Sequence, residues 1–184
     1  MSAVAARIHL RPWVREDAEA LRRALRHSPD LETQVDTSLA ASAERARRFI
    51  AGSLTFGAQH KNLAIIEEGQ AVGNIGVSAI EWRHETAWVS YWLAAEVRGR
   101  GYATRSLASV ANWAFQEGLF RLELGHRVNN PGSCRVAVAA GFTPEGVERL
   151  KLRYGAQRFD VETHSRLKTD PVPDLIQVPL CTSF

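Results

Sequence analysis

The sequence predicts a single mixed α/β domain, built on a mostly antiparallel sheet of about seven strands flanked by about four helices. Three observations predict it: a run of short strand-like segments between residues 62 and 93, an amphipathic helix over 104–116, and a return to strand patterning over 121–128 and 142–168. The chain has 184 residues. That length suits one such domain and is too short for two ordinary ones.

The first 54 residues predict one strand followed by two helices. Apolar and polar residues alternate over 8–12 and then meet Pro12, which is typical of a short strand. A helix follows from Glu16, because acidic residues precede apolar ones at helical spacing. The helical pattern returns over 41–54, and the residues between the helices, 28–38, predict a polar connection.

The pattern then changes to that of strands. The segments 62–67, 71–82 and 86–93 are rich in Val, Ile, Leu and Trp and are separated by short polar turns at 68–70 and 83–85. Strand-like runs joined by turns this short are typical of an antiparallel meander.

The second half predicts helices alternating with strands. After the helix over 104–116 and the strand over 121–128, Asn130 and Pro131 have the residue types of an N-cap and a first helical position, and that helix ends by Gly141. Residues 142–168 predict a hairpin that turns at 154–156. The tail, 169–184, contains three prolines and no clear period, so we expect a surface arm or partial disorder.

Composition excludes several classes of function. The net charge is +3 and the arginines are scattered, which argues against a nucleic-acid partner. The sequence contains no apolar run long enough to span a membrane and no secretory leader, so we expect a cytoplasmic protein. The two cysteines, Cys134 and Cys181, form no Cys-x-x-Cys motif. We therefore expect no metal and no disulfide scaffold, and Cys134 is interpreted as a buried filler or, alternatively, a nucleophile.

A glycine-rich turn, Val97–Ala103, lies between a predicted strand and a predicted helix. Its glycines let backbone N–H groups converge, and the helix N-terminus adds partial positive charge, which together favour phosphate binding. Arg98 and Arg100 add full charges. The Lys-Ser/Thr pair of a Walker loop is missing, and the turn follows an antiparallel meander rather than opening a dinucleotide-binding βαβ unit.

Together with its neighbours, this turn resembles the GNAT acetyltransferases. Arg98-x-x-Gly101-x-Ala103 matches the Gln/Arg-x-x-Gly-x-Gly/Ala motif of that family. The resemblance is to the Rim-type branch, the bacterial ribosomal-protein N-terminal acetyltransferases, and spans a domain at 7–168, leaving 169–184 as a tail or arm. It also rests on Tyr91-Trp92-Leu93, Trp113-Ala114-Phe115, Asn130-x-x-Ser133, Gly141-Phe142 and Asp160.

The resemblance implies a GNAT-like sheet in which two parallel strands splay apart around acetyl-CoA, the cosubstrate. Backbone groups near Leu93–Ala95 would pair with the pantetheine arm, and the turn would hold the pyrophosphate. The implied coenzyme-binding residues are Leu93, Ala94, Ala95, Arg98, Gly99, Arg100, Gly101, Tyr102, Ala103, Thr104, Asn130 and Ser133.

The same resemblance frames the catalytic residues. We expect direct attack of the amine in a ternary complex, with Ser133 as donor to the leaving thiolate, or alternatively as a simple helix cap. The Tyr that many relatives carry as donor is replaced by Ala137, and the Glu that Rim-type relatives often carry as base is replaced by Trp88. A water chain remains open as the base, as do the side chains of Glu81, His84, Glu85, Glu123 and His126.

The predicted function is therefore transfer of acetyl from acetyl-CoA to a primary amine, either a protein N-terminus or a small molecule. The alternative is a non-catalytic acyl-CoA-binding or regulatory module of the same fold, which the Trp at position 88 favours. A homodimer is a further expectation, because Leu175, Ile176 and Val178 give the tail an apolar surface.

Overall fold

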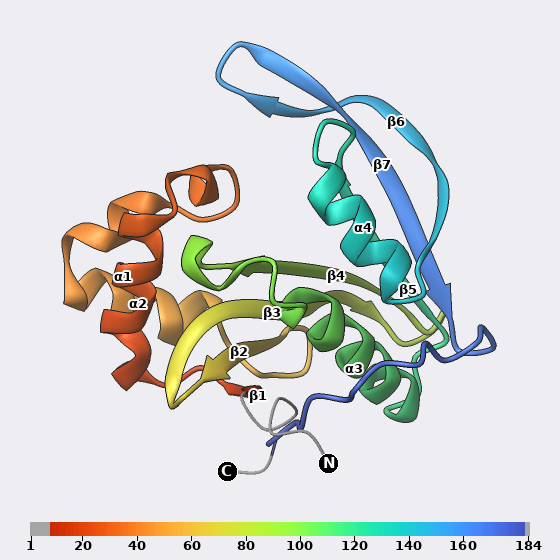
Figure 1. Cartoon of the computed structure of the whole chain (residues 1–184), viewed down its shortest axis with the longest axis horizontal. Coiled ribbons are helices and arrows are strands. Elements are labelled where there is room, and N and C mark those ends of the chain that lie inside the picture. The colour runs from red at the N-terminus through yellow and green to blue at the C-terminus, as the bar shows by residue number, and fades with distance from the viewer. Residues whose placement is uncertain (1–7, 183–184) are drawn as a thin grey trace.

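A computed structural model describes residues 8–182 as one sheet with helices packed against it (Figure 1). The seven-stranded sheet has the order β1-β2-β3-β4-β5-β7-β6. Four α-helices accompany it among the described residues, so the predicted architecture is confirmed. In chain order the strands and α-helices are β1 (Ile8–Pro12), α1 (Ala18–His27), α2 (Ala43–Ser53), β2 (Lys61–Glu67), β3 (Gln70–Glu81), β4 (Thr86–Leu93), α3 (Tyr102–Gln116), β5 (Arg121–Arg127), α4 (Pro131–Ala139), β6 (Thr143–Tyr154) and β7 (Gln157–Leu167).

The polar connection between α1 and α2 is more ordered than its composition indicates. It contains two 3-10 helices, η2 (Pro29–Thr33) and η3 (Thr37–Ala41). Leu31 and Leu39 are buried, one from each. Each short helix is therefore anchored to the core by a single leucine, a signal too sparse to show as a period in the sequence.

The sheet is antiparallel except at one junction. Strands β1 to β4 pair antiparallel in order, whereas β4 and β5 run parallel because α3 crosses between them. That parallel pairing covers only three positions, Thr86↔Arg121, Ala87↔Leu122 and Trp88↔Glu123. Beyond Trp88 the two strands diverge, so the predicted splay is present and lies at the carboxyl end of β4.

Helices cover both faces of the sheet. Trp92 stacks obliquely on Trp13, with ring centroids 6.1 Å apart, on the side where Trp13 meets α2. Its neighbour Tyr91 instead donates a hydrogen bond to the backbone carbonyl of Ser133 in α4. Because successive residues of a strand point to opposite faces, α2 and α4 cover opposite faces. In Figure 1, α3 and α4 lie side by side over β4 and β5.

The C-terminal tail is packed onto its own chain up to residue 182. The backbone N–H of Leu10 donates to Pro179, and that of Val178 donates to the Ser109 hydroxyl of α3. Val178 is buried by this contact, whereas Ile176 is exposed. Of the three apolar tail residues considered for a dimer surface, Val178 is thus already covered by its own chain.

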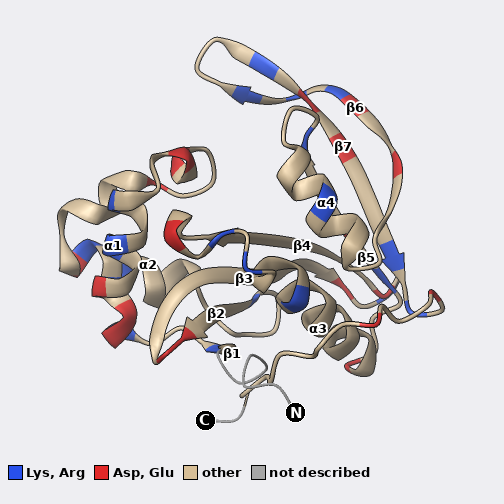
Figure 2. Cartoon of the chain, in the orientation of Figure 1, with Lys and Arg blue, Asp and Glu red and all other residues tan. Residues whose placement is uncertain are grey.

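Charged residues of both signs are interspersed over the helices and the final hairpin (Figure 2). Many of them pair, and one group is centred on Arg121 at the start of β5, which binds Glu123 and Glu145. The Arg121 guanidinium, helped by the Ser165 hydroxyl, lowers the pKa of Glu145 from 4.5 to about 2. No helix within residues 8–182 is long and apolar enough to cross a membrane.

The depressed pKa of Glu145 predicts an acid-dependent loss of stability. The interaction is fully present above the unfolded pKa of 4.5 and is lost as the pH falls toward about 2. Because both side chains are partly solvated, we expect Glu145→Gln to lower the free energy of unfolding by about 0.5–1 kcal/mol near neutral pH. Urea denaturation of both proteins across this range should show the difference shrinking with acid. A difference that stays constant would contradict the assignment.

Candidate active site

A cavity of about 580 Å³ opens between the glycine-rich turn, the end of β4 and α4. Its walls come from segments far apart in the sequence: η2, the end of β4, residues 98–104 and the first two turns of α4. Arg98 and Arg135 line it together with a single carboxylate, Asp30, among the described residues. The cavity is therefore biased toward an anionic ligand.

The end of the cavity that is predicted to bind phosphate is formed by the turn before α3. Gly99 and Gly101 have φ angles of +77° and +75°, and a Cβ on either would meet no atom within 4 Å. The first bond within α3 runs from the Arg105 N–H to the Gly101 carbonyl, so the preceding N–H groups have no partner inside the helix. Residues 101–104 line the cavity, so these donors and the positive end of the helix dipole lie at its wall.

The two arginines of the turn are committed to internal partners. Arg98 donates two hydrogen bonds to the Leu93 carbonyl, at 3.1 and 2.9 Å, and pairs with Asp30 at 2.9 Å. Arg100 binds the Glu67 carboxylate, which also accepts the Tyr102 hydroxyl. Arg98 thus braces the cavity wall, and Arg100 anchors the turn to the end of β2, away from the cavity lining.

The segment predicted to pair with pantetheine is partly occupied by the fold itself. The Ala94 N–H donates to Val72 of β3, and the Ala95 N–H donates to the Ser28 hydroxyl at 2.9 Å. Because backbone groups alternate in direction along a strand, the polar groups of Leu93 face the splay instead. Of this segment, Leu93 lines the cavity.

Asn130 and Ser133 form the polar corner at the start of α4. The Asn130 side chain accepts a hydrogen bond from the Ser133 backbone N–H, so Asn130 is the N-cap, as predicted. Its amide also donates to the Ser133 hydroxyl at 3.1 Å. With one lone pair of that oxygen engaged, the hydroxyl hydrogen is free to donate into the cavity that both residues line.

Tyr91 is a lining residue that the sequence patterns did not assign to the site. Its hydroxyl lies 3.3 Å from the Ser133 carbonyl, and burial raises the pKa of the Tyr91 phenol. The phenol therefore stays protonated and braces α4 against β4. Asp30, Gln34 and Arg135 also line the cavity. They were not singled out from the sequence, because nothing in their local sequence distinguishes them from solvated residues.

Trp88 occupies the position where Rim-type relatives carry a Glu, and it packs over Gly125. A Cβ on Gly125 would lie 2.8 Å from Val161 and 3.1 Å from the Trp88 ring. The Nζ atom of Lys151 lies over the Trp88 ring, 5.3 Å from the ring centroid. The indole therefore fills the space at the point where β4 and β5 separate.

Of the four predicted catalytic residues, Ser133 lines the cavity and the other three, Glu81, Glu123 and His126, do not. Glu81 is exposed at the end of β3, where its carboxylate accepts the Arg83 N–H. Glu123 pairs with Arg121 at 2.7 Å near the start of β5. Both are at the opposite end of β4 from the glycine-rich turn, so the structure does not bring them together with Ser133.

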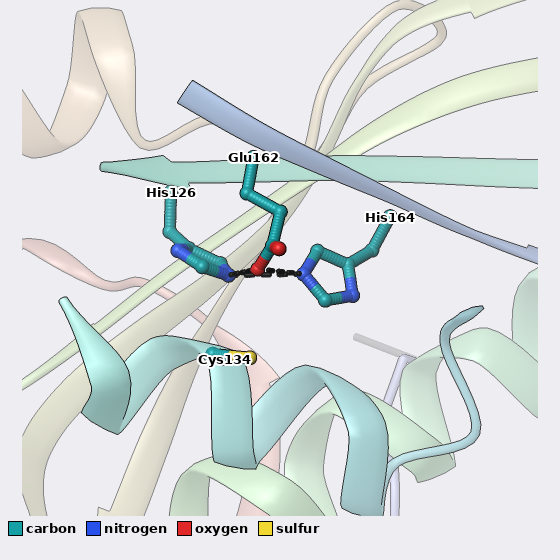
Figure 3. Close-up of side chains that lie close together, drawn as sticks. All are labelled: His126, Cys134, Glu162 and His164. Atoms are coloured by element: carbon teal, nitrogen blue, oxygen red, sulfur yellow. Dashed lines mark hydrogen bonds and ion pairs between the residues drawn. The ribbon is translucent and has the colours of Figure 1, made fainter. Parts of the chain in front are cut away.

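His126 lies between α4 and the β5–β7 pair, in a cluster of side chains that was not predicted from the sequence. Its Nε2 is 3.0 Å from Nε2 of His164, and both nitrogens approach the Glu162 carboxylate (Figure 3). Cys134, next to Ser133 on α4, faces the same group. Hydrogen bonding by His164 is the main cause that lowers the pKa of Glu162, and burial raises the pKa of the Cys134 thiol.

Comparisons with known proteins agree with this geometry. Residues 7–143 match the family model of the acetyltransferase (GNAT) domain. The ribosomal-protein-serine acetyltransferase of Escherichia coli (strain K12) is 32% identical over 108 residues, which span 58% of this chain and 60% of that protein. The match thus spans less than two thirds of this curated relative.

Solved structures show the same fold over most of the chain. RimL, a ribosomal L7/L12 α-N-protein acetyltransferase in complex with coenzyme A, superposes with a TM-score of 0.80 at 24% identity, covering 89% of this chain and 96% of RimL. Mycobacterium smegmatis RimJ in complex with a CoA disulfide gives 0.81 at 22%, covering 89% and 83%. The family match ends at residue 143, and the final hairpin of β6 and β7 belongs to the same seven-stranded sheet as the matched strands. The chain belongs to the GNAT acetyltransferase family, and the predicted resemblance is confirmed.

Proposed function

We propose that this protein transfers the acetyl group of acetyl-CoA to a primary amine by direct attack within a ternary complex. The observation that carries the proposal is the cavity itself. It joins a helix N-terminus suited to a pyrophosphate, a splay suited to an extended pantetheine arm, and a hydroxyl poised at the far wall.

Coenzyme binding would rest on backbone groups more than on charged side chains. Arg98 and Arg100 are engaged with Asp30 and Glu67, so within the glycine-rich turn the N–H groups at the start of α3 are the donors available to the phosphates. The Leu93 backbone would pair with the pantetheine amides, and Arg98 holds the Leu93 carbonyl until the ligand arrives.

Ser133 would donate a hydrogen bond to the departing thiolate and so stabilise its negative charge, while the thiolate takes its proton from solvent. Asn130 orients the hydroxyl oxygen, and the N-terminus of α4 favours negative charge at that place. The amine would release its proton to solvent at the mouth of the cavity. The one carboxylate among the described lining residues, Asp30, is already paired with Arg98. The acceptor amine must therefore arrive at least partly neutral.

The acceptor to test first is a protein N-terminal α-amine, because the curated relative is named for a ribosomal-protein serine. We expect thiol release from acetyl-CoA with peptides that carry a free N-terminal Ser or Ala, and none with the same peptides blocked at the N-terminus. A thiol-reactive dye and mass spectrometry of the peptide measure this. Saturable CoA binding without thiol release, across peptides and small amines including polyamines, would favour the non-catalytic module instead.

Ser133→Ala should lower kcat by about tenfold to a hundredfold while changing coenzyme affinity by less than about twofold. The Asn130 cap bonds the Ser133 backbone N–H, which the variant keeps, so α4 should remain folded. Ser133→Thr retains a hydroxyl and should recover part of the rate. Wild-type turnover in Ser133→Ala would assign the side chain to helix capping alone.

Gly101→Val should weaken CoA binding at least about tenfold, because a β-branched residue at φ +75° strains the turn and displaces its N–H donors. Gly155→Val is the matched control. It imposes similar strain at φ +59° in the hairpin turn, with open space around its Cβ, far from the cavity. Calorimetric titration of both folded variants should separate them; equal CoA affinities would argue against the phosphate cradle.

A further inference from the structure

Four side chains of types that bind metals converge between α4 and the paired strands β5 and β7, outside the lining of the cavity. They come from three elements: His126 from β5, Cys134 from α4, and Glu162 and His164 from β7 (Figure 3). One ligand atom of each lies within 4.8 Å of the other three. We propose that these residues bind a single Zn²⁺ ion.

The distances within the cluster are those of a metal site. A tetrahedral zinc ion with nitrogen and oxygen ligands at about 2.0–2.1 Å holds those ligand atoms about 3.3 Å apart. The three separations here are 3.0 Å between the two Nε2 atoms, 3.3 Å from His126 to Glu162 and 3.1 Å from His164 to Glu162. The Cys134 sulfur lies within 4.8 Å of these atoms, and a tetrahedral site needs it about 3.6 Å from them, so its side chain would move inward by up to about 1 Å.

The protonation pattern also favours a cation. Nδ1 of His126 lies 3.0 Å from the Arg127 carbonyl, which can only accept, so that nitrogen carries the hydrogen and Nε2 of the neutral ring is a bare acceptor. This is the outer contact that commonly orients a metal-binding histidine. The bare Nε2 of His126 and the Glu162 carboxylate both face Nε2 of His164, which as a neutral ring can supply one hydrogen to only one of them, whereas a cation can bind all three atoms.

Burial and donor type select zinc over harder ions. The side chains of His126 and His164 are 5% and 0% exposed, so an ion held between them would be shielded from solvent. Two imidazoles, a thiol and one carboxylate suit Zn²⁺, whereas Mg²⁺ and Ca²⁺ prefer oxygen ligands throughout. The expectation of no metal rested on spacing along the chain, and these ligands meet only through the β5–β7 pairing.

The ion would link α4 to the paired strands β5 and β7, which form one side of the gap between β4 and β5. Cys134 directly follows Ser133, and Glu162 and His164 share one face of β7 because they are two residues apart. Four protein ligands leave no open coordination position, as in structural zinc sites. The metal would therefore fix the start of α4, and with it the wall of the cavity, without touching the substrates.

The test is zinc binding by the metal-stripped full chain, measured by competition with a chromophoric chelator. We expect one Zn²⁺ per chain, and at least about tenfold weaker binding in Cys134→Ser and in Glu162→Gln. Cys181→Ser, at the exposed cysteine, is the matched control and should bind as the wild type. Substoichiometric zinc in the wild type would mean that the imidazole pair holds only a proton, and would overturn the proposal.

Cobalt substitution supplies a readout that does not depend on affinity or activity. Co²⁺ in the wild type and in Cys181→Ser should show a tetrahedral spectrum with a thiolate charge-transfer band, and Cys134→Ser should lack that band. A band that persists in Cys134→Ser would place the metal elsewhere and overturn the site. Thermal melts of the metal-free variants check that each is folded, and added Zn²⁺ should raise the melting temperature only where the ligands are intact.

Discussion

The short parallel contact between β4 and β5 is the constraint on which the rest of the site depends. Pairing of the two strands ends at Trp88↔Glu123, and the Trp88 ring then lies over Gly125, where any side chain would collide. The crossover through α3 makes the pair parallel and carries the glycine-rich turn to the end of β4. One topological feature therefore opens the gap and places the turn that we propose to bind phosphate at its mouth.

The same region shows how the fold uses charge. The sequence predicts that Arg98 and Arg100 bind phosphate. In the structure each of them instead has an acidic partner and a carbonyl partner. Such partly exposed pairs add little stability individually. Their effect is to fix the backbone of the turn, so that the N–H donors at the start of α3 are already oriented when an anion arrives.

Most of the fold could be predicted because local pattern and topology agree. The meander over β2–β4 has short turns that permit only neighbouring antiparallel strands, and Asn130 with Pro131 announces α4 by the chemistry of helix capping. The glycine-rich turn at the proposed coenzyme end of the cavity could also be predicted, since its glycines have positive φ angles. The 3-10 helices before α2 could not, because each is held by one buried leucine.

The surroundings of the predicted catalytic residue His126 were harder to predict, because they form only through tertiary pairing. His126 alone on a strand suggests a base, but β7 inserts between β5 and β6 and sets Glu162 and His164 against it. This placement changes the chemistry available to His126: an imidazole enclosed by a second imidazole and a carboxylate is suited to hold a cation, and it is poorly placed to take a proton from an incoming amine. Ser133 and Cys134 are adjacent in sequence yet face different partners, Ser133 the cavity and Cys134 the cluster. The first turn of α4 thus joins the proposed leaving-group donor to the proposed metal site, so that the position of one constrains the other.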